Sequence, residues 1–382
     1  MVLVTLATFS DILAYSIAVP VLPDLSSRLG ASPTMIGFLF ASFGVTVLAT
    51  SIPMGALSDR MGRRGPLVCG AVVLAAATIL FAFADSLALL FAARLVQGAA
   101  DAVTWVVGFA LLADLYASDE RGRAMGWVMS ATTFGFMIGP TLGGWLYEHG
   151  GPTVPYLLVA ALSAIAAAGF LWLQPADHRE AAERVSLRQV LGVRAVAVCA
   201  AAVVLGGGTI AMLEPVLSLF LADQIGLSPS RVGLVFGSGA VVSAVLHPVF
   251  GRVADRTGGR RLMMLGLGGM ALLMPLLSRI ESFESAVALN ACFTLAVAVM
   301  ITPSLAYMAD AMTVAGVRSF GVAYGVYNFA WALGLLVGPA LGGAAYERLG
   351  FTPLLFSWAG LLLPMTILIA RSGRRAVVPA RV

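Results

Sequence analysis

Two stretches of the chain, GFMIGPTLGG at residues 135–144 and GLLVGPALGG at residues 334–343, are close copies of each other. They begin 199 residues apart in a chain of 382, and both run on into a Tyr-Glu pair. A second phrase, GALSDRMGRR from Gly55, returns as GRVADRTGGRR from Gly251, 196 residues later. Because both offsets are about half the chain length, we interpret the sequence as an internal duplication of glycine-rich apolar runs and basic turns.

The composition predicts a membrane protein. Hydrophobic residues make up 60% of the chain, charged residues 11%, and the mean hydropathy is +0.95, whereas a soluble domain has about 25% charged residues. A spanning helix needs about 20 apolar residues, and these runs are too long and too uniformly apolar for barrel strands of about 10 residues. We therefore predict an all-α polytopic protein with 12 spans, near 2–22, 33–54, 66–84, 87–113, 123–147, 153–173, 192–222, 230–250, 262–280, 284–311, 320–345 and 352–371.

The arginines predict the orientation, because short cytoplasmic loops carry an excess of basic residues. All 23 basic residues are arginine. With both termini inside, 18 of them fall in cytoplasmic segments, and Arg94 lies within a span. The other four, Arg28, Arg231, Arg279 and Arg348, fall outside. The halves are then parallel repeats related by an axis along the membrane normal, and the net charge of +4 requires no nucleic-acid partner.

The predicted organisation is an N-terminal six-helix bundle over residues 1–173 and a C-terminal one over 191–371. A polar cytoplasmic linker at 174–190 joins them, and a cytoplasmic tail covers 372–382. The first span has no basic segment before it and no cleavage site after it, so we interpret it as a retained helix and not a signal peptide. The sequence has no phosphate-binding glycine loop, metal-ligand cluster or catalytic triad, so we expect neither an enzyme nor a metal site.

The repeated phrases resemble two motifs of the major facilitator superfamily. The basic turn after span 2 resembles its signature loop, whose ion pairs are expected to form in one conformational state and break in the other. The glycine-proline run in span 5 resembles the motif of its antiporter members, in which close helix packing forms a hinge. Plain helix packing would use the same glycines. The gating residues that the resemblance implies are Gly55, Asp59, Arg60, Gly62, Arg63, Arg64, Gly135, Gly139, Pro140, Gly143, Gly144, Asp255, Arg256, Gly338 and Pro339.

Nearly the whole chain is similar to the vesicular amine transporter branch and its bacterial relatives among the drug:proton antiporters. The similarity rests on Asp11 ahead of Val19-Pro20, span 4 through the Arg121-Gly122-Arg123 loop, Leu213-Glu214-Pro215, and the span 11 motif that ends in Tyr346-Glu347. Arg94, Gln97 and Gly98 match the span 4 pattern of the superfamily as a whole. The chain also departs from that branch, which leaves the stoichiometry and the substrates open. Asn328 replaces an acidic residue in span 11, and apolar residues stand near Phe43 and Ala298, where the branch has a lysine and an acid.

Ionisable residues inside spans locate a candidate site without reference to any family. Each costs about 2.5–3.5 kcal/mol on insertion scales, so such residues usually mark a pathway. In span 4, Arg94 and Asp101 share one helix face with Gln97 and Trp105. If the fold is the expected one, spans 1, 4, 7 and 10 line the central cavity. The alternative is a structural ion pair between Arg94 and one of the acids. The candidates for proton coupling or for pairing with a cation are Asp11, Glu214, Asp101 and Arg94.

A cavity with carboxylates and aromatic faces suits an amine or a lipophilic cation. Burial disfavours the charged form of a carboxyl group, so Asp11 or Glu214 is expected to hold either a proton or the cation. We therefore predict a monomeric proton-coupled antiporter of the bacterial inner membrane that exports organic cations, amines or drugs, with protons as the coupling ion and no cofactor. The expected substrate-binding residues are Tyr15, Gln97, Trp105, Tyr307, Tyr324, Tyr327, Asn328 and Trp331.

Two alternatives stay open at this point. The first is a facilitator or proton symporter for a neutral metabolite such as a sugar, although a uniporter of that kind has no need for three acids in the cavity spans. The second is a receptor-like or structural membrane protein on the same scaffold.

Overall fold

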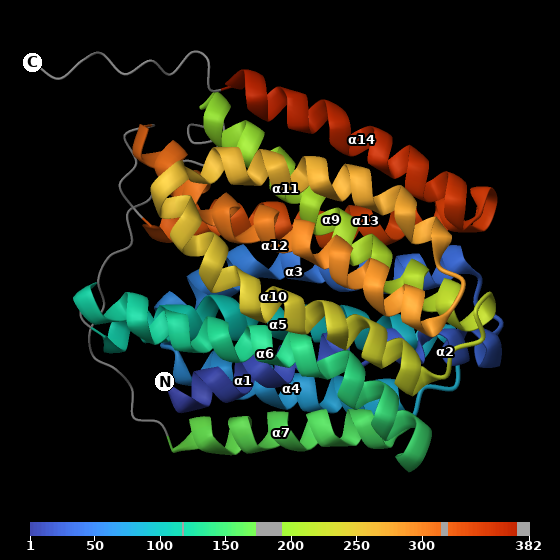
Figure 1. The fold of residues 1–382 in the computed structure, drawn as a ribbon. Helices are drawn as coiled ribbons and strands as arrows, with labels where there is room; N and C mark the ends of the chain where they lie inside the picture. The colour runs from blue at the N-terminus through green and yellow to red at the C-terminus, as the bar shows by residue number, and fades with distance from the viewer. Residues whose placement is uncertain (117, 173–192, 315–319, 373–382) are drawn as a thin grey trace, which may run out of the picture.

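The computed structural model describes residues 1–116, 118–172, 193–314 and 320–372, and these contain helices and no strand (Figure 1). The first half forms α1 (Val2–Ser16), η1 (Val19–Val21), α2 (Leu22–Leu29), α3 (Pro33–Met61), α4 (Arg64–Ala82), α5 (Leu87–Leu115), α6 (Ser118–Gly150) and α7 (Val154–Leu171). The second half forms α9 (Arg194–Asp223), α10 (Pro229–Thr257), α11 (Gly259–Leu273), η2 (Met274–Arg279), α12 (Phe283–Val314), α13 (Phe320–Leu349) and α14 (Phe351–Ser372).

The predicted fold of 12 spans is confirmed. Eleven helical segments of the described chain are long and apolar enough to cross a membrane. The twelfth crossing is α6, which has 33 residues but is rich in glycine, threonine and serine. The predicted linker at 174–190 and residues 373–382 of the predicted tail lie outside the described residues, so the domain boundaries stay predictions.

Prolines break two spans that the hydropathy pattern showed as continuous. The first span stops as an α-helix at Ser16 and continues through η1 and α2, which begin around Pro20 and Pro23. The ninth span changes from α11 to the 3₁₀ helix η2 at Pro275. A proline removes a backbone donor and clashes with the preceding turn, so the regular helix ends there.

The helix bundle has two distinct ends. One end, which we call the arginine-rich end, carries the turns after α3 and α10, where Gly62 and Gly258 have φ values of 84° and 86°. This left-handed region favours glycine. The other end, which we call the opposite end, carries the turns at Gly30 and Gly226. In Figure 1 the N-terminus lies at the left with the arginine-rich end, and α2 lies at the right.

The two halves meet along α3 with α13 and along α6 with α10, and α10 lies beside α6 in the middle of Figure 1. At these crossings glycines of one half lie directly against backbone of the other. A Cβ on Gly37 would collide with the carbonyl oxygen of Pro339, and a Cβ on Gly233 would collide with that of Pro140. The repeated glycine-proline run therefore lies at the interface between the halves, where two backbones touch.

Candidate functional site

Two hydrogen bonds between the halves join the first span to α9, the first helix of the second half. The Tyr15 hydroxyl donates to Oε2 of Glu214 over 2.5 Å, and the Ser218 hydroxyl donates to the carbonyl oxygen of Val19 over 2.7 Å. Tyr15 lies in α1, Val19 begins η1, and both acceptor and donor of the second half lie in α9. The two halves therefore meet along α1 and α9, at Tyr15 and Glu214.

Glu214 lies in α9 with only 5% of its surface exposed. Three glycines about two turns earlier let neighbouring helices approach α9 closely: Gly206 lies against Met300 of α12, and the other two face α13. Gly207 lies against the ring of Trp331, and a Cβ on Gly208 would be in contact with Gly334 and Gly338 of α13. α9 runs without a break through Pro215. The local sequence thus places Glu214 on a helix that packs tightly against its own half and presents its carboxylate to the other half.

Asp11 and Asp101 form a second cluster, between α1 and α5 inside the first half. Oδ2 of Asp11 accepts a hydrogen bond from Nε1 of Trp105 over 3.1 Å, whereas Oδ1 has no donor among the described residues. Asp11 is 1% exposed and Asp101 is 8% exposed. The cluster therefore holds two buried carboxyl groups, and that of Asp101 shares one face of α5 with the Trp105 ring.

Arg94 is fully buried in α5 but has no carboxylate within ion-pair distance among the described residues. Its guanidinium lies over the rings of Phe40 at 4.6 Å, Phe81 at 5.0 Å and Tyr15 at 5.7 Å. Nη1 donates weakly to Gln97 over 3.4 Å, while Nε and Nη2 have no acceptor. The alternative of a structural ion pair is therefore wrong in this conformation. The charge is held mainly by aromatic faces.

The other predicted substrate-binding residues are dispersed. Tyr15 and Trp105 contact the acids, and Gln97 donates to Thr78 over 3.3 Å. Further residues pack in the second half and are not joined to Glu214 by a hydrogen bond. Tyr327 bonds to Ser304 over 3.1 Å, Tyr307 lies against Gly259, Trp331 lies against Gly207, and Asn328 is half-buried. The side chain of Tyr324 lies outside the described residues.

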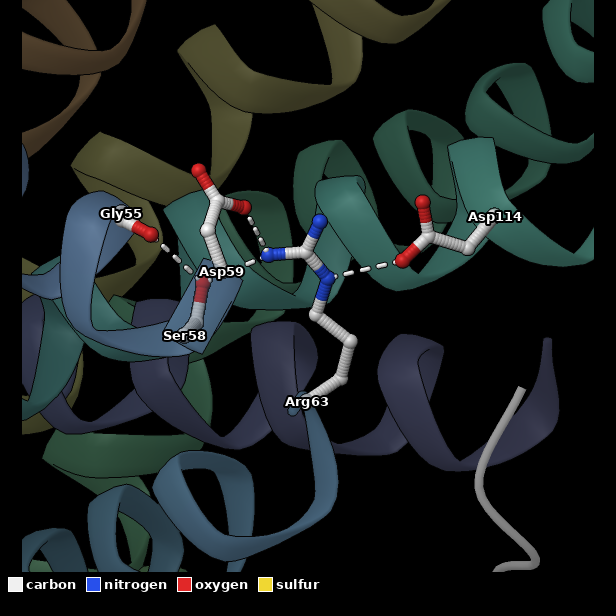
Figure 2. A network of polar contacts seen from close by, with 5 residues as sticks. All are labelled: Gly55, Ser58, Asp59, Arg63 and Asp114. Atoms are coloured by element: carbon white, nitrogen blue, oxygen red, sulfur yellow. Dashed lines mark hydrogen bonds and ion pairs between the residues drawn. The ribbon is translucent and has the colours of Figure 1, made fainter. Parts of the chain in front are cut away.

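The signature loop forms a polar network at the arginine-rich end, entirely within the first half (Figure 2). Arg63 donates through Nε to Asp114 over 2.7 Å and through Nη1 to Asp59 over 2.6 Å and Ser58 over 2.7 Å. Partial burial lowers the pKa of the Arg63 guanidinium, but its bonds to Asp114 and Asp59 outweigh this and raise the pKa. The network ties the end of α3 to the end of α5.

The remaining residues of the predicted loop motif divide between helix-end contacts and solvent. Arg64 donates to the carbonyl oxygen of Leu171, the last residue of α7, while Arg60 and Arg256 are exposed. The side chain of Asp255 lies outside the described residues, so the second copy of the network stays a prediction.

At the opposite end, two glutamates that the sequence reasoning did not select cap helices of the other half. Oε2 of Glu347 accepts a hydrogen bond from the backbone N–H of Thr34 over 2.9 Å, and Oε2 of Glu148 accepts one from Ser230 over 3.0 Å. The acceptors are the glutamates of the repeated Tyr-Glu pairs, and the donors lie in the first turns of α3 and α10. A carboxylate at a helix N-terminus satisfies free N–H groups and complements the helix dipole. The repeat itself was the signal that could have identified them.

Each end of the bundle has a hollow. The hollow at the opposite end has a volume of about 260 Å³ and includes Pro20, Asp24 and Asp223 in its lining. The hollow at the arginine-rich end has a volume of about 570 Å³ and lies between α1 and α6, with Phe9, Trp127 and Phe134 in a mostly apolar wall. Neither hollow has Glu214 or Asp11 in its lining. With exposures of 5% and 1%, both acids are enclosed in this conformation.

A duplicated helical bundle whose halves meet at a buried carboxylate is typical of membrane transporters. The model of the Major Facilitator Superfamily matches residues 4–213 and 199–380. The chain belongs to this superfamily, so it is a transporter and not an enzyme.

Solved structures show the same fold. A bacterial homolog of the human lysosomal transporter Spinster, in an inward-facing and occupied conformation, superposes with a TM-score of 0.83 at 14% identity. The alignment covers 99% of this chain and 98% of that one. The human organic anion transporter MFSD10 (TETRAN) superposes with a TM-score of 0.69 at 21% identity, covering 96% and 98% of the two chains.

Relatives by sequence include proteins named as amine and acetylcholine transporters. The chromaffin granule amine transporter of Homo sapiens is 29% identical over 324 residues, covering 83% of this chain and 61% of the relative. The synaptic vesicular amine transporter of Bos taurus is 30% identical over 333 residues, covering 86% and 64%. The vesicular acetylcholine transporter of Rattus norvegicus is 31% identical over 353 residues, covering 88% and 66%. The chain thus spans about three fifths of the length of these relatives. The resemblance to their branch is confirmed, and the neutral-metabolite alternative gains no support.

Proposed function

We propose that this transporter is a proton-coupled antiporter that exports organic cations, such as amines or lipophilic drugs, by alternating access. It acts in the bacterial inner membrane with the arginine-rich end toward the cytoplasm, in agreement with the positive-inside rule. Protons are the coupling ion, no other cofactor takes part, and the unit that transports is a monomer. The names of the relatives, which include amine and acetylcholine transporters, support this class of substrate.

The observation that carries the proposal is the enclosure of three carboxyl groups without an ion-pair partner. Asp11, Asp101 and Glu214 are all buried, and none forms a salt bridge in the described part of the chain. An unpaired carboxylate inside a membrane protein is costly and needs a proton or a cation to neutralise it. Two ligands that neutralise the same carboxylate exclude each other, which is the physical requirement for exchange.

The mechanism follows from this competition. With the cytoplasmic end open, an organic cation binds at the acids and displaces protons to the cytoplasm. With the other end open, protons from outside displace the cation. Each unit charge that crosses a potential of 100 mV contributes about 2.3 kcal/mol. When more than one proton enters per monovalent cation exported, the net inward charge drives export against a gradient.

The contacts between the halves support a resting state that is closed at the opposite end. The glycine crossings Gly37–Pro339 and Gly233–Pro140 close the opposite end, and Glu148 and Glu347 add capping bonds there. Rotation of one half against the other would separate these contacts and expose the acids to the outside. The glycine-proline runs then serve as the packed faces that must come apart.

The test uses proteoliposomes with a trapped pH dye and an imposed pH gradient. Internal pH is followed while phenylethylamine, ethidium, tetraphenylphosphonium and acetylcholine are added in turn. We expect proton movement with at least one of these cations and its loss in Glu214→Gln, which keeps the side-chain shape but cannot exchange a proton. The matched control is Glu281→Gln, the same substitution at an exposed site. Saturable flux of a neutral solute, with no proton movement for any cation, would refute the proposal.

A further inference from the structure

The ring of Tyr15 belongs to the first half. It packs against Phe40 and Phe43 of α3, with ring centroids at 5.7 and 5.2 Å, and against Phe136 of α6 at 6.1 Å. Tyr15 is 3% exposed. Rings held on three sides have little rotational freedom, so the position of the hydroxyl is fixed by α1, α3 and α6. If the halves separate, this hydroxyl moves with the first half.

The partner of that hydroxyl belongs to the second half. Glu214 lies in α9, and the bond of 2.5 Å crosses the interface between the halves. Going from this bond toward the opposite end, further hydrogen bonds between the halves join Ser218 to Val19 and Thr141 to Gly233, and the caps at Thr34 and Ser230 follow. Of these hydrogen bonds, only that of Tyr15 to Glu214 involves a carboxyl group that the proposed transport cycle must load.

The occupancy of Glu214 decides whether the bond can persist. An ionised carboxylate accepts the Tyr15 proton in a charge-assisted hydrogen bond, which is stronger than a neutral one. A cationic substrate or a proton on Glu214 neutralises that charge, so the bond loses its charge assistance and weakens. The other charged groups next to the pair are Arg94, whose guanidinium lies over the Tyr15 ring, and Asp101 of α5.

We propose that Tyr15 is the residue that links opening of the opposite end to the occupancy of Glu214. When Glu214 is charged and empty, its bond to Tyr15 holds the halves together and the end stays closed. When Glu214 carries a cation or a proton, the bond is released and the halves can separate. An antiporter requires that only the loaded carrier reorients. If the empty carrier also reoriented, protons could cross the membrane without exchange for substrate. The inference rests on the proposed antiport and assigns Tyr15 a positioning role in it in place of the substrate contact predicted from the sequence.

The test measures opening directly and requires no substrate. The full chain is reconstituted in liposomes with Cys69, Cys199 and Cys292 changed to alanine and with Ser218→Cys as reporter, since Ser218 is fully buried at the interface. The rate of labelling by N-ethylmaleimide reports separation of the halves at the opposite end. We expect Tyr15→Phe to label about tenfold faster, because one charge-assisted hydrogen bond of typical strength has been lost.

The matched control is Tyr156→Phe. Tyr156 is 2% exposed and its hydroxyl has no hydrogen-bond partner, so the substitution removes the same atom without removing a contact. Its labelling rate should equal that of the parent. In a Glu214→Gln background, Tyr15→Phe should add little, because the two residues act through one interaction. Equal labelling of the parent and Tyr15→Phe would overturn the proposal, and so would an equal acceleration by Tyr156→Phe.

Failure of this inference and failure of the proposed function give different results. If the wild type exchanges amines for protons but Tyr15→Phe labels at the parent rate, the antiport stands and the link through Tyr15 is wrong. If no cation moves protons but Tyr15→Phe labels faster, the contact controls opening and the antiport is wrong. A rise in proton leak without substrate in Tyr15→Phe, and not in Tyr156→Phe, is expected when both are right.

Discussion

Arg94 brings a full positive charge into the interior of α5 and leaves two of its nitrogens without acceptors. Buried charges are usually paired because removing them from water is expensive. Here the neighbours are Phe40, Phe81 and Tyr15, which offset only part of that cost through cation–π contacts. A group that is retained at such a cost is more consistent with a role in transport than with a role in folding.

Replacement of Arg94 by methionine tests this distinction. Met fills a similar volume and packs on aromatic rings, and replacing buried ionic groups with apolar ones is often neutral or stabilising by about 1–4 kcal/mol. We expect Arg94→Met to unfold at an equal or higher temperature than the wild type in detergent, and to lose proton-coupled transport. A matched control is Leu90→Met in the same buried helix, which should retain transport. A large drop in melting temperature with Arg94→Met would show that Arg94 is structural.

The sequence identified the candidate acids but not their partners. Asp11, Asp101 and Glu214 were evident as charges inside apolar runs, and the structure shows that all three are buried. The bond of Glu214 to Tyr15 was not evident, because it depends on how the halves are placed relative to each other. The same holds for Phe40 and Phe81 around Arg94. Both lie in apolar runs, where an aromatic residue gives no sign that it faces a charge.

At the level of helices, the opposite end is closed by two equivalent caps. Glu148 lies in the last turn of α6 and caps the N-terminus of α10. Glu347 lies in the last turn of α13 and caps the N-terminus of α3. Each cap joins helices of different halves, so each must break when that end opens. The Arg63 network at the arginine-rich end differs in this respect, because its partners Asp59 and Asp114 belong to the same half.

The double substitution Glu148→Gln with Glu347→Gln should shift the molecule toward the outward-open state. Glutamine keeps an acceptor oxygen but loses the charge that favours a helix N-terminus. We expect faster maleimide labelling of the Ser218→Cys reporter than in the parent. The control is Glu284→Gln, because Glu284 lies in the first turn of its own helix, α12, within the second half. Labelling that is equal in the double variant and the control would show that the caps do not hold the end closed.

Hydropathy predicted the number of helices but not the irregularities within them. The breaks at Pro20 and Pro275 follow from proline chemistry, yet both residues lie in apolar runs that were predicted as continuous spans. Apolar composition satisfies the membrane in either conformation, so a hydropathy pattern cannot distinguish an α-helix from a short 3₁₀ segment.

At the scale of the whole molecule, the pseudo-two-fold symmetry makes the two glycine crossings equivalent. Gly37 contacts Pro339, and its repeat equivalent Gly233 contacts Pro140. At both crossings a Cβ would collide with the carbonyl oxygen of the proline. Backbone cannot yield as a flexible side chain does. A methyl group at either glycine therefore destabilises the closed arrangement of the halves.

Gly37→Ala and Gly233→Ala should therefore act alike. Each is expected to increase labelling of the Ser218→Cys reporter and to slow exchange, because the closed state must tolerate a clash. Gly360→Ala is the control, since a Cβ there meets open space in α14, and alanine favours a helix over glycine by about 1 kcal/mol. A strong effect at one crossing and none at the other would mean that the halves do not close symmetrically.

The sequence by itself determined that the protein lies in a membrane, how many spans it has, that its two halves are a duplication, and which charged residues lie inside spans. These properties are local or periodic, and composition and repeat spacing are sufficient to predict them. Only the tertiary structure decided that Tyr15 meets Glu214, that Arg94 lies among rings, and that Glu148 and Glu347 cap helices of the other half. Each of these contacts depends on how the helices pack. The contacts between the halves also depend on how the two bundles are placed relative to each other. Side-chain packing at the interface determines that placement, and no local sequence pattern encodes it.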